Sequence, residues 1–364
     1  MSIWTTQVKA AAGIALAATL MLVLPAAVQA ASLQKCFGEK DSGIEPGRYG
    51  KIVGTEGDDV IVAQGKFGEI DAKGGDDLIC VPGAAYEVQG GDGDDLIKGG
   101  PQRDFLYGGD GNDEIIGGDH EDELEGGSGE DVVAGGAGDD WVEGGIGNDA
   151  LDGGADRDRV IGLAGDDVLV GSQDRDWLEA GSGADEAWGG GGNDYVTDGS
   201  GADIVDLGAG SDDIFAANDG AADSYVAGEG NDEIAFYRHA SGVHVSLDDV
   251  ANDGRNCPQQ CEGDNVSASF ENVIGSYYED TLIGNAASNR LDGGRGSDVI
   301  DAGDGADILR GDVGTDSLNG GAGDDSLSGG GGDDALDGGS ENDDCRGDNG
   351  VDVGVNCESV VAIP

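Results

Sequence analysis

The chain has 364 residues, 73 of them glycine, and its 76 acidic residues outnumber 18 basic ones to give a formal net charge of −58. This charge excludes nucleic acid as a partner and opposes binding to an anionic membrane surface. It also opposes collapse into a compact core, so the composition fits either a disordered acidic chain or one that folds around cations.

Residues 1–30 have the features of a secretory signal peptide. Lys9 precedes an apolar run from Ala10 to Leu24, and Val28-Gln29-Ala30 fits a small-residue cleavage site. The run is short for a membrane span. We therefore expect an exported protein, secreted or held at the cell surface, with no stable membrane span after the signal is cleaved.

All six cysteines lie beyond the expected signal peptide. An even number in an exported chain favours disulfides over metal thiolates, although six cysteines allow fifteen pairings. Their positions suggest three local bridges, which are Cys36–Cys80, Cys257–Cys261 and Cys345–Cys357.

From Gly54 to Phe215 the chain repeats a nine-residue pattern, in one phase, over eighteen copies. Gly90 to Lys98 reads Gly-Gly-Asp-Gly-Asp-Asp-Leu-Ile-Lys, or G-G-x-G-x-D-x-U-x with U a large apolar residue. The glycines permit a turn with positive φ, and the aspartate at position 6 offers hard oxygen ligands. Positions 7–9 fit a short strand with position 8 facing inward. Because a disordered chain has no reason to keep this phase, the pattern predicts an ordered repeat.

This motif resembles the RTX (hemolysin-type) calcium-binding nonapeptide repeat, whose copies wind into a parallel β-roll. The resemblance implies an all-β solenoid with two copies in each turn. It also implies multiple Ca²⁺ ions, each held between two loops of the same edge by the aspartates at position 6. The chemistry agrees, since carboxylates and backbone carbonyls suit a large hard cation.

Alternate copies of the pattern differ, which supports an 18-residue turn independently of the resemblance. Register 1, the copies that begin at Gly54 and every eighteenth residue, keeps glycine at position 4 and aspartate at position 6 throughout. Register 2, which begins at Ala63, lacks the aspartate in its first two loops and varies at position 4. We expect the register-2 edge to bind fewer ions, and Asp131→Ala to weaken calcium-driven folding more than Asp122→Ala.

The candidate calcium ligands are the aspartates at position 6. In register 1 of the first block they are Asp59, Asp77, Asp95, Asp113, Asp131, Asp149, Asp167, Asp185 and Asp203. In register 2 they are Asp104, Asp122, Asp140, Asp158, Asp176, Asp194 and Asp212. Later copies add Asp232, Asp280, Asp298, Asp307, Asp316, Asp325, Asp334 and Asp343.

The repeats divide the chain into segments. We expect an N-terminal cap at 31–53, a first repeat block at 54–235, a second block at 275–346 and a C-terminal cap at 347–364. Between the blocks, residues 236–274 form a non-repetitive connector, in which Gly242–Leu247 and Phe270–Ile274 are expected to be strands.

No catalytic motif accompanies the repeats, since the sequence contains neither H-E-x-x-H nor G-x-S-x-G. We therefore expect no enzyme, but a structural calcium-binding protein. The alternative is a calcium-dependent adhesin that binds a polysaccharide or a surface protein. Two outward surfaces could serve it, or could reflect only cross-strand stacking and β-propensity. Position 7 of register 2 gives Phe105, Glu123, Trp141, Arg159, Trp177 and Tyr195, and register 1 points Ile116, Val132 and Trp188 outward.

Overall fold

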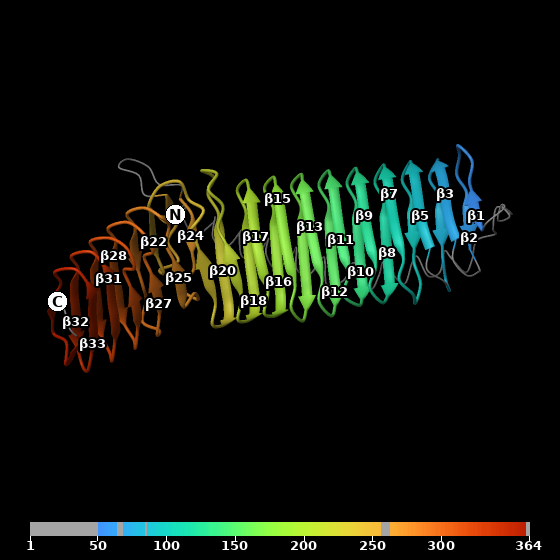
Figure 1. Cartoon of the computed structure of the whole chain (residues 1–364). Helices are drawn as coiled ribbons and strands as arrows, with labels where there is room; N and C mark the ends of the chain where they lie inside the picture. The colour runs from blue at the N-terminus through green and yellow to red at the C-terminus, as the bar shows by residue number, and fades with distance from the viewer. Residues whose placement is uncertain (1–49, 64–67, 84–85, 256–262, 362–364) are drawn as a thin grey trace, which may run out of the picture. The chain divides into compact units, whose positions relative to one another are not determined.

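The computed structural model describes residues 50–63, 68–83, 86–255 and 263–361 (Figure 1). Within these ranges the regular secondary structure is β-strand, and no helix is present that could cross a membrane. The predicted all-β parallel β-roll is confirmed. The chain falls into two compact units, residues 1–159 and 160–364. Residues 1–30, Cys36, Cys257 and Cys261 lie outside the described residues, so the predicted signal peptide and two of the predicted bridges do too.

In the first unit two parallel sheets face each other, and each copy contributes one strand. The register-1 strands are β2 (Val60–Val62), β4 (Leu78–Cys80), β6 (Leu96–Lys98), β8 (Glu114–Asp119), β10 (Val132–Ala137) and β12 (Ala150–Ala155). The register-2 strands are β1 (Lys51–Val53), β3 (Gly68–Gly74), β5 (Tyr86–Asp92), β7 (Phe105–Asp110), β9 (Glu123–Ser128) and β11 (Trp141–Ile146). Each strand pairs with the strand eighteen residues away, which confirms the 18-residue turn.

The core is built mainly from the side chain at position 8 of each copy. Position 8 is buried in every described repeat of the first unit, as at Ile79, Leu106 and Leu151, which are 0% exposed. Positions 7 and 9 are mostly half-buried because side chains alternate along a strand. Ile116, expected to point outward, is only 2% exposed between Lys98 and Ala134 of the adjoining strands.

The second unit continues the same plan with three sheets. Its register-2 sheet holds β13 (Arg159–Ala164), β15 (Trp177–Ser182), β17 (Tyr195–Ser200), β19 (Asp213–Phe215), β21 (Glu233–Ala235), β25 (Asn272–Ile274), β27 (Arg290–Asp292), β29 (Ile308–Arg310), β31 (Ser326–Gly331), β33 (Asp344–Asn349) and β35 (Ser359–Val361).

The opposite face of the second unit is divided into two sheets. Its first sheet holds β14 (Val168–Gln173), β16 (Glu186–Gly192), β18 (Ile204–Gly210), β20 (Ser224–Gly230) and β24 (Asn265–Val266). Its second holds β23 (Gly254–Arg255), β22 (Val243–Ser246), β26 (Thr281–Ile283), β28 (Val299–Asp304), β30 (Ser317–Ala322), β32 (Ala335–Ser340) and β34 (Val353–Val355).

The break falls in the predicted connector, where β22 and β25 form inside the two expected strand segments. Asp253 joins the two sheets across the break. Its carboxylate accepts hydrogen bonds from the backbone N–H of Ser246, the last residue of β22, and of Val266 in β24, at 2.6 and 2.9 Å. Asp253 is 0% exposed, so it acts as a buried link between β22 and β24.

The solenoid extends beyond the predicted repeats at both ends. Strand β1 lies in the expected N-terminal cap, where Ile52 pairs with Ile70 and is buried. At the other end β34 and β35 add strands within residues 347–364. Position 8 of β34 is Gly354, so backbone pairing continues there without the apolar side chain that marks a repeat. The boundaries between caps and blocks stay predictions.

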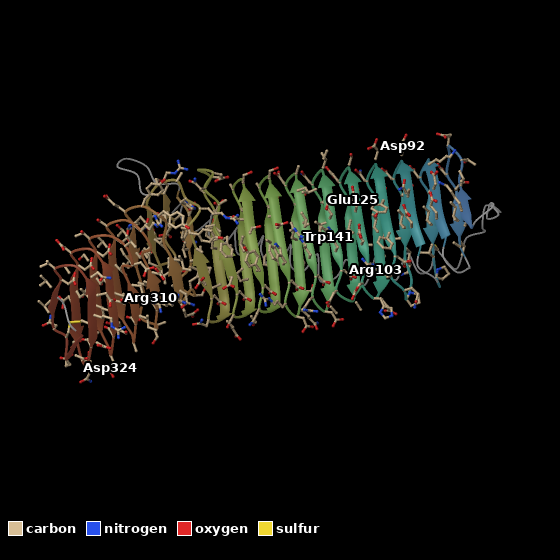
Figure 2. All side chains as sticks on the ribbon, viewed as in Figure 1. Asp92, Arg103, Glu125, Trp141, Arg310 and Asp324 are labelled. Atoms are coloured by element: carbon tan, nitrogen blue, oxygen red, sulfur yellow. A yellow bond between two sulfur atoms is a disulfide. The ribbon has the colours of Figure 1, made fainter. Side chains whose placement is uncertain are left out.

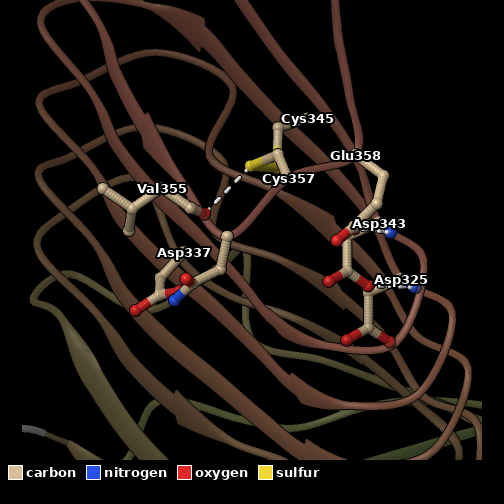
Figure 3. The surroundings of a disulfide bond; sticks show 8 residues. Asp325, Asp337, Asp343, Cys345, Val355, Cys357 and Glu358 are labelled. Atoms are coloured by element: carbon tan, nitrogen blue, oxygen red, sulfur yellow. Dashed lines mark hydrogen bonds between the residues drawn. A yellow bond between two sulfur atoms is a disulfide. The ribbon is translucent and has the colours of Figure 1, made fainter.

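The disulfide predicted at the C-terminal end is present (Figure 3). Cys345 and Cys357 are bonded, with their Cα atoms 5.9 Å apart. Cys345 occupies the inward position 8 of its repeat and is 2% exposed. Cys80 is also disulfide-bonded.

Candidate calcium sites along the loop edges

The loops that carry the aspartates lie at opposite ends of the strands. Figure 2 shows Asp92, in a register-1 loop, and Arg103, in a register-2 loop, at opposite edges of the first unit. A regular loop turns through two residues with positive φ, such as Gly91 (122°) and Gly93 (127°). A Cβ at Gly91 would lie 1.9 Å from the carbonyl oxygen of Lys73, so glycine lets successive turns approach this closely.

Every predicted aspartate at position 6 is buried. These residues form rows that we call carboxylate ladders. In a ladder each Oδ1 atom accepts a hydrogen bond from the backbone N–H of the position-6 residue one turn earlier, as from Asp77 to Asp95 at 2.8 Å. The first unit contains the ladders Asp59–Asp77–Asp95–Asp113–Asp131–Asp149 and Asp104–Asp122–Asp140–Asp158. In the second unit two ladders begin Asp167–Asp185–Asp203 and Asp176–Asp194–Asp212–Asp232, and two more join Asp280–Asp298–Asp316–Asp334 and Asp307–Asp325–Asp343.

The second oxygen of most ladder carboxylates, Oδ2, is buried without a hydrogen-bond partner. This holds for Asp77, Asp95, Asp113, Asp122, Asp131, Asp140, Asp185, Asp194, Asp203, Asp212, Asp232, Asp298, Asp307, Asp316, Asp325, Asp334 and Asp343. Burial raises the pKa of Asp95 to about 7 and that of Asp122 to about 8, although backbone hydrogen bonds oppose the shift. Burying a carboxylate with one unpaired oxygen is energetically unfavourable unless a cation binds beside it.

The surroundings of these oxygens fit calcium. A Cβ at Gly90 would lie 2.2 Å from Oδ2 of Asp95 and 2.6 Å from the carbonyl oxygen of Gly108 in the next turn, so oxygens of two turns converge beside the glycine. In the described residues no group of three or more His, Cys, Asp or Glu side chains could hold a metal ion. Backbone carbonyls would therefore have to complete the ligand set, as calcium sites allow.

Among the loops that the structure describes, four differ because their position-6 side chain already accepts a second hydrogen bond from within the loop; we call them closed loops. The backbone N–H of position 2 donates to the side chain at position 6, from Thr55 to Asp59 (2.7 Å), Gly100 to Asp104 (2.9 Å), Ser276 to Asp280 (2.6 Å) and Asn285 to Asn289 (2.9 Å). Position 2 has no positive φ in these loops. Asp59 and Asp104 head the ladders of the first unit, and Asp280 and Asn289 head those that follow the connector.

The ladders include residues that the nine-residue phase did not predict. The backbone N–H of Asp203 donates to Oδ1 of Asp223, and the backbone N–H of Asp223 donates to Oδ1 of Asp264. The insertion after Phe215 therefore does not end the ladder. Asp334 donates to Asp352. Two ladders end on glutamates, because the N–H of Asp232 donates to Glu271 and that of Asp343 donates to Glu358. The signal that remains in sequence is an acidic residue two positions before a buried strand residue, as in Asp223-Ser224-Tyr225.

The two edges of the first repeat block are alike from Asp122 onward. Asp122 and Asp131 are 3% and 1% exposed, and both accept and donate in the same pattern. His120 adopts φ of 71° at position 4, as Asp156 and Asp174 also do with positive values, so these substitutions preserve the turn. The loops therefore differ between the registers in the first three register-2 copies, since two lack the aspartate and the third, which carries Asp104, is closed. That the register-2 edge binds fewer ions stays a prediction.

Outward side chains on the register-2 sheets form the predicted aromatic and cationic row. In the first unit the Arg159 guanidinium lies 4.5 Å from the centre of the Trp141 ring. In the second unit the ring centres of Trp177 and Tyr195 are 4.4 Å apart with planes tilted by 39°. Phe215, at position 9 and outside the predicted row, adds a third ring 4.7 Å from Tyr195 with planes tilted by 34°. The rings therefore turn much of their faces toward each other, which favours stiffening of the sheet.

Comparison with known proteins identifies the repeats. A search of the curated proteins finds no match. A search of the solved structures matches the chain to the crystal structure of a hyperactive, Ca²⁺-dependent, β-helical antifreeze protein from an Antarctic bacterium, with 19% identity, coverage of 71% of this chain and 85% of that one, and a TM-score of 0.28. The family described as RTX calcium-binding nonapeptide repeat matches residues 89–124, 116–151, 125–160, 152–187, 188–220, 274–309 and 310–345. These matches span more than half of the sequence, and the chain therefore belongs to the RTX calcium-binding nonapeptide repeat family.

Proposed function

We propose that this protein is exported through its N-terminal signal and folds as it binds multiple Ca²⁺ ions, with a structural role outside the cell and no catalysis. The observation that carries this proposal is the row of buried, unpaired Oδ2 atoms along both loop edges. Calcium bound beside these carboxylates would neutralise their negative charge. Because most copies bury only one large apolar side chain, the free energy of ion binding becomes the free energy of folding.

A calcium titration followed by circular dichroism tests this. In chelator the mature chain should be largely disordered, since unpaired buried carboxylates oppose folding. β-Structure should appear at roughly 10⁻⁴–10⁻³ M calcium, the range of extracellular calcium modules. Magnesium should be far less effective because it demands tighter geometry and keeps its water. Full β-structure in excess chelator would contradict the proposal.

A second candidate is a calcium-dependent adhesin that binds a polysaccharide or a surface protein. The observation in its favour is that Trp141 and Trp177 remain 43% exposed on the register-2 face. A glycan array probed with and without calcium would separate the candidates. Calcium-dependent binding that is lost on Trp177→Ala, with β-structure retained, supports the adhesin. Absence of binding at saturating calcium favours a purely structural protein.

A further inference from the structure

Two glutamates outside the repeat motif occupy the ladder position of the aspartates. In the register-2 sheet of the second unit, Asn272 pairs with Glu233, which places Glu271 opposite Asp232. Ser359 pairs with Asp344, which places Glu358 opposite Asp343. Glu271 and Glu358 thus stand at position 6 of the turns after Asp232 and Asp343.

The glutamates make the same hydrogen bond as a ladder aspartate. Glu271 Oε2 accepts from the backbone N–H of Asp232 at 2.9 Å, and Glu358 Oε2 accepts from that of Asp343 at 2.8 Å. The bond from Asp194 to Oδ1 of Asp212 is 2.7 Å. Figure 3 shows Asp325, Asp343 and Glu358 following one another in a row.

The aspartate beside each glutamate has a buried oxygen that a cation could bind. Asp232 and Asp343 are 0% and 2% exposed, and the Oδ2 atom of each lacks a hydrogen-bond partner. A second carboxylate beside such a group adds like-charge repulsion unless a cation lies between them. A neutral side chain would serve if the need were only to accept an N–H, as Asn289 does for the N–H of Asn285.

The loops before the two glutamates differ from regular ones. Residues 267–270 and 355–357 lack the paired glycines of the repeat motif. The backbone after each glutamate nevertheless pairs with the ladder, since the N–H groups of Asn272 and Ser359 donate to the carbonyl oxygens of Asp232 and Asp343 at 3.0 Å.

We propose that Glu271 and Glu358 are calcium ligands that complete the last site of their ladders, shared with Asp232 and Asp343. The proposal rests on the calcium-driven function above and assigns two sites that the repeat motif does not contain. It predicts that the ions extend one gap beyond the last aspartate of each of these ladders.

The test uses the full mature chain with Glu271→Gln and Glu358→Gln, and Glu229→Gln as the control. Glu229 is exposed and outside every ladder, so its substitution changes the net charge equally. Glutamine keeps an oxygen that accepts the N–H and removes only the charge. Native mass spectrometry at saturating calcium counts the ions. Hydrogen exchange followed over a calcium titration measures protection of residues 272–274 and 359–361.

A calcium ligand at Glu358 predicts one ion fewer in Glu358→Gln and a higher calcium midpoint for protection of residues 359–361, with the same outcome for residues 272–274 in Glu271→Gln. The control should match the unmodified protein. Glutamine variants that also match it would overturn the proposal and leave only a hydrogen-bonding cap, which Glu358→Ala would disrupt. If the unmodified protein binds no calcium, the proposed function itself fails, which is a different result.

Discussion

At the scale of single residues, the two oxygens of a ladder aspartate have different roles. Oδ1 accepts a backbone N–H from the preceding turn, as Asp77 does from Asp59 at 2.7 Å. Oδ2 of Asp77 has no protein partner, whereas Oδ2 of Asp59 accepts the N–H of Thr55. The same residue type at the same repeat position is therefore open to a cation in one loop and closed in the next.

We expect Asp77→Asn to raise the calcium concentration needed for folding, on the order of tenfold for the ion concerned, since the charge and one oxygen are lost. Asp59→Asn should leave the midpoint nearly unchanged, because an amide oxygen can accept the N–H of position 2, as Asn289 does. Calorimetric calcium titration of the matched pair measures both. Equal effects would show that closed loops also bind calcium.

The buried carboxyls also predict a dependence on pH in the absence of calcium. Burial raises the pKa of Asp95 to about 7 and of Asp122 and Asp203 to about 8, well above the ordinary pKa of an aspartate. The folded state then binds more protons than the unfolded state, so stability is present at low pH and lost as pH rises through these folded values. In chelator, lowering the pH from about 8 to 5 should increase β-structure by circular dichroism. An unchanged spectrum would contradict the role assigned to burial.

At the scale of elements, the two edges of a turn are equivalent once both carry ladders. Asp122 and Asp131 have the same burial and the same hydrogen-bond pattern. We therefore expect Asp122→Ala and Asp131→Ala to lower the ion count equally and to shift the calcium midpoint by similar amounts. A much larger effect at Asp131 would restore the sequence-based expectation of a weaker register-2 edge.

At the same scale, Asp253 links β24, the last strand of one sheet, to β22 in the next sheet. Asp253→Ala leaves the backbone N–H groups of Ser246 and Val266 buried without an acceptor, and should lower the free energy of unfolding by roughly 3 kcal/mol. Asp253→Asn keeps one acceptor oxygen and should cost about half as much. Denaturant unfolding at saturating calcium gives both values. A neutral Asp253→Ala would mean that the break needs no such link.

At the scale of the whole molecule, each turn is supported by its neighbours, so local damage should spread only gradually. Reducing Cys345–Cys357 releases the bond between β33 and the segment before β35. Hydrogen exchange at saturating calcium should then quicken in residues 344–361 and stay unchanged in residues 86–159. Uniform loss of protection would instead indicate one cooperative unit.

The sequence by itself determined the turn length, the inward residues and most of the ladder aspartates. A strict nine-residue phase with glycines, an aspartate and one apolar residue allows few other structures, and the strand register confirms it from Val60 onward in the first unit. Cys345–Cys357 was also predictable, because Cys345 replaces the apolar residue at position 8 near the end of the repeats.

Only the tertiary structure decided where the ladders continue, close and end. Asp223 and Asp264 are separated by 41 residues yet adjoin in space, because the chain forms β22 in the following sheet before it returns to pair β24 with β20. Glu271 and Glu358 carry no motif, and their role appears only from pairing with strands far away in sequence. Whether a loop is open or closed depends on φ at position 2, and the residue type at position 6 does not predict that angle. These features arise from pairing between distant turns, which a local pattern does not encode.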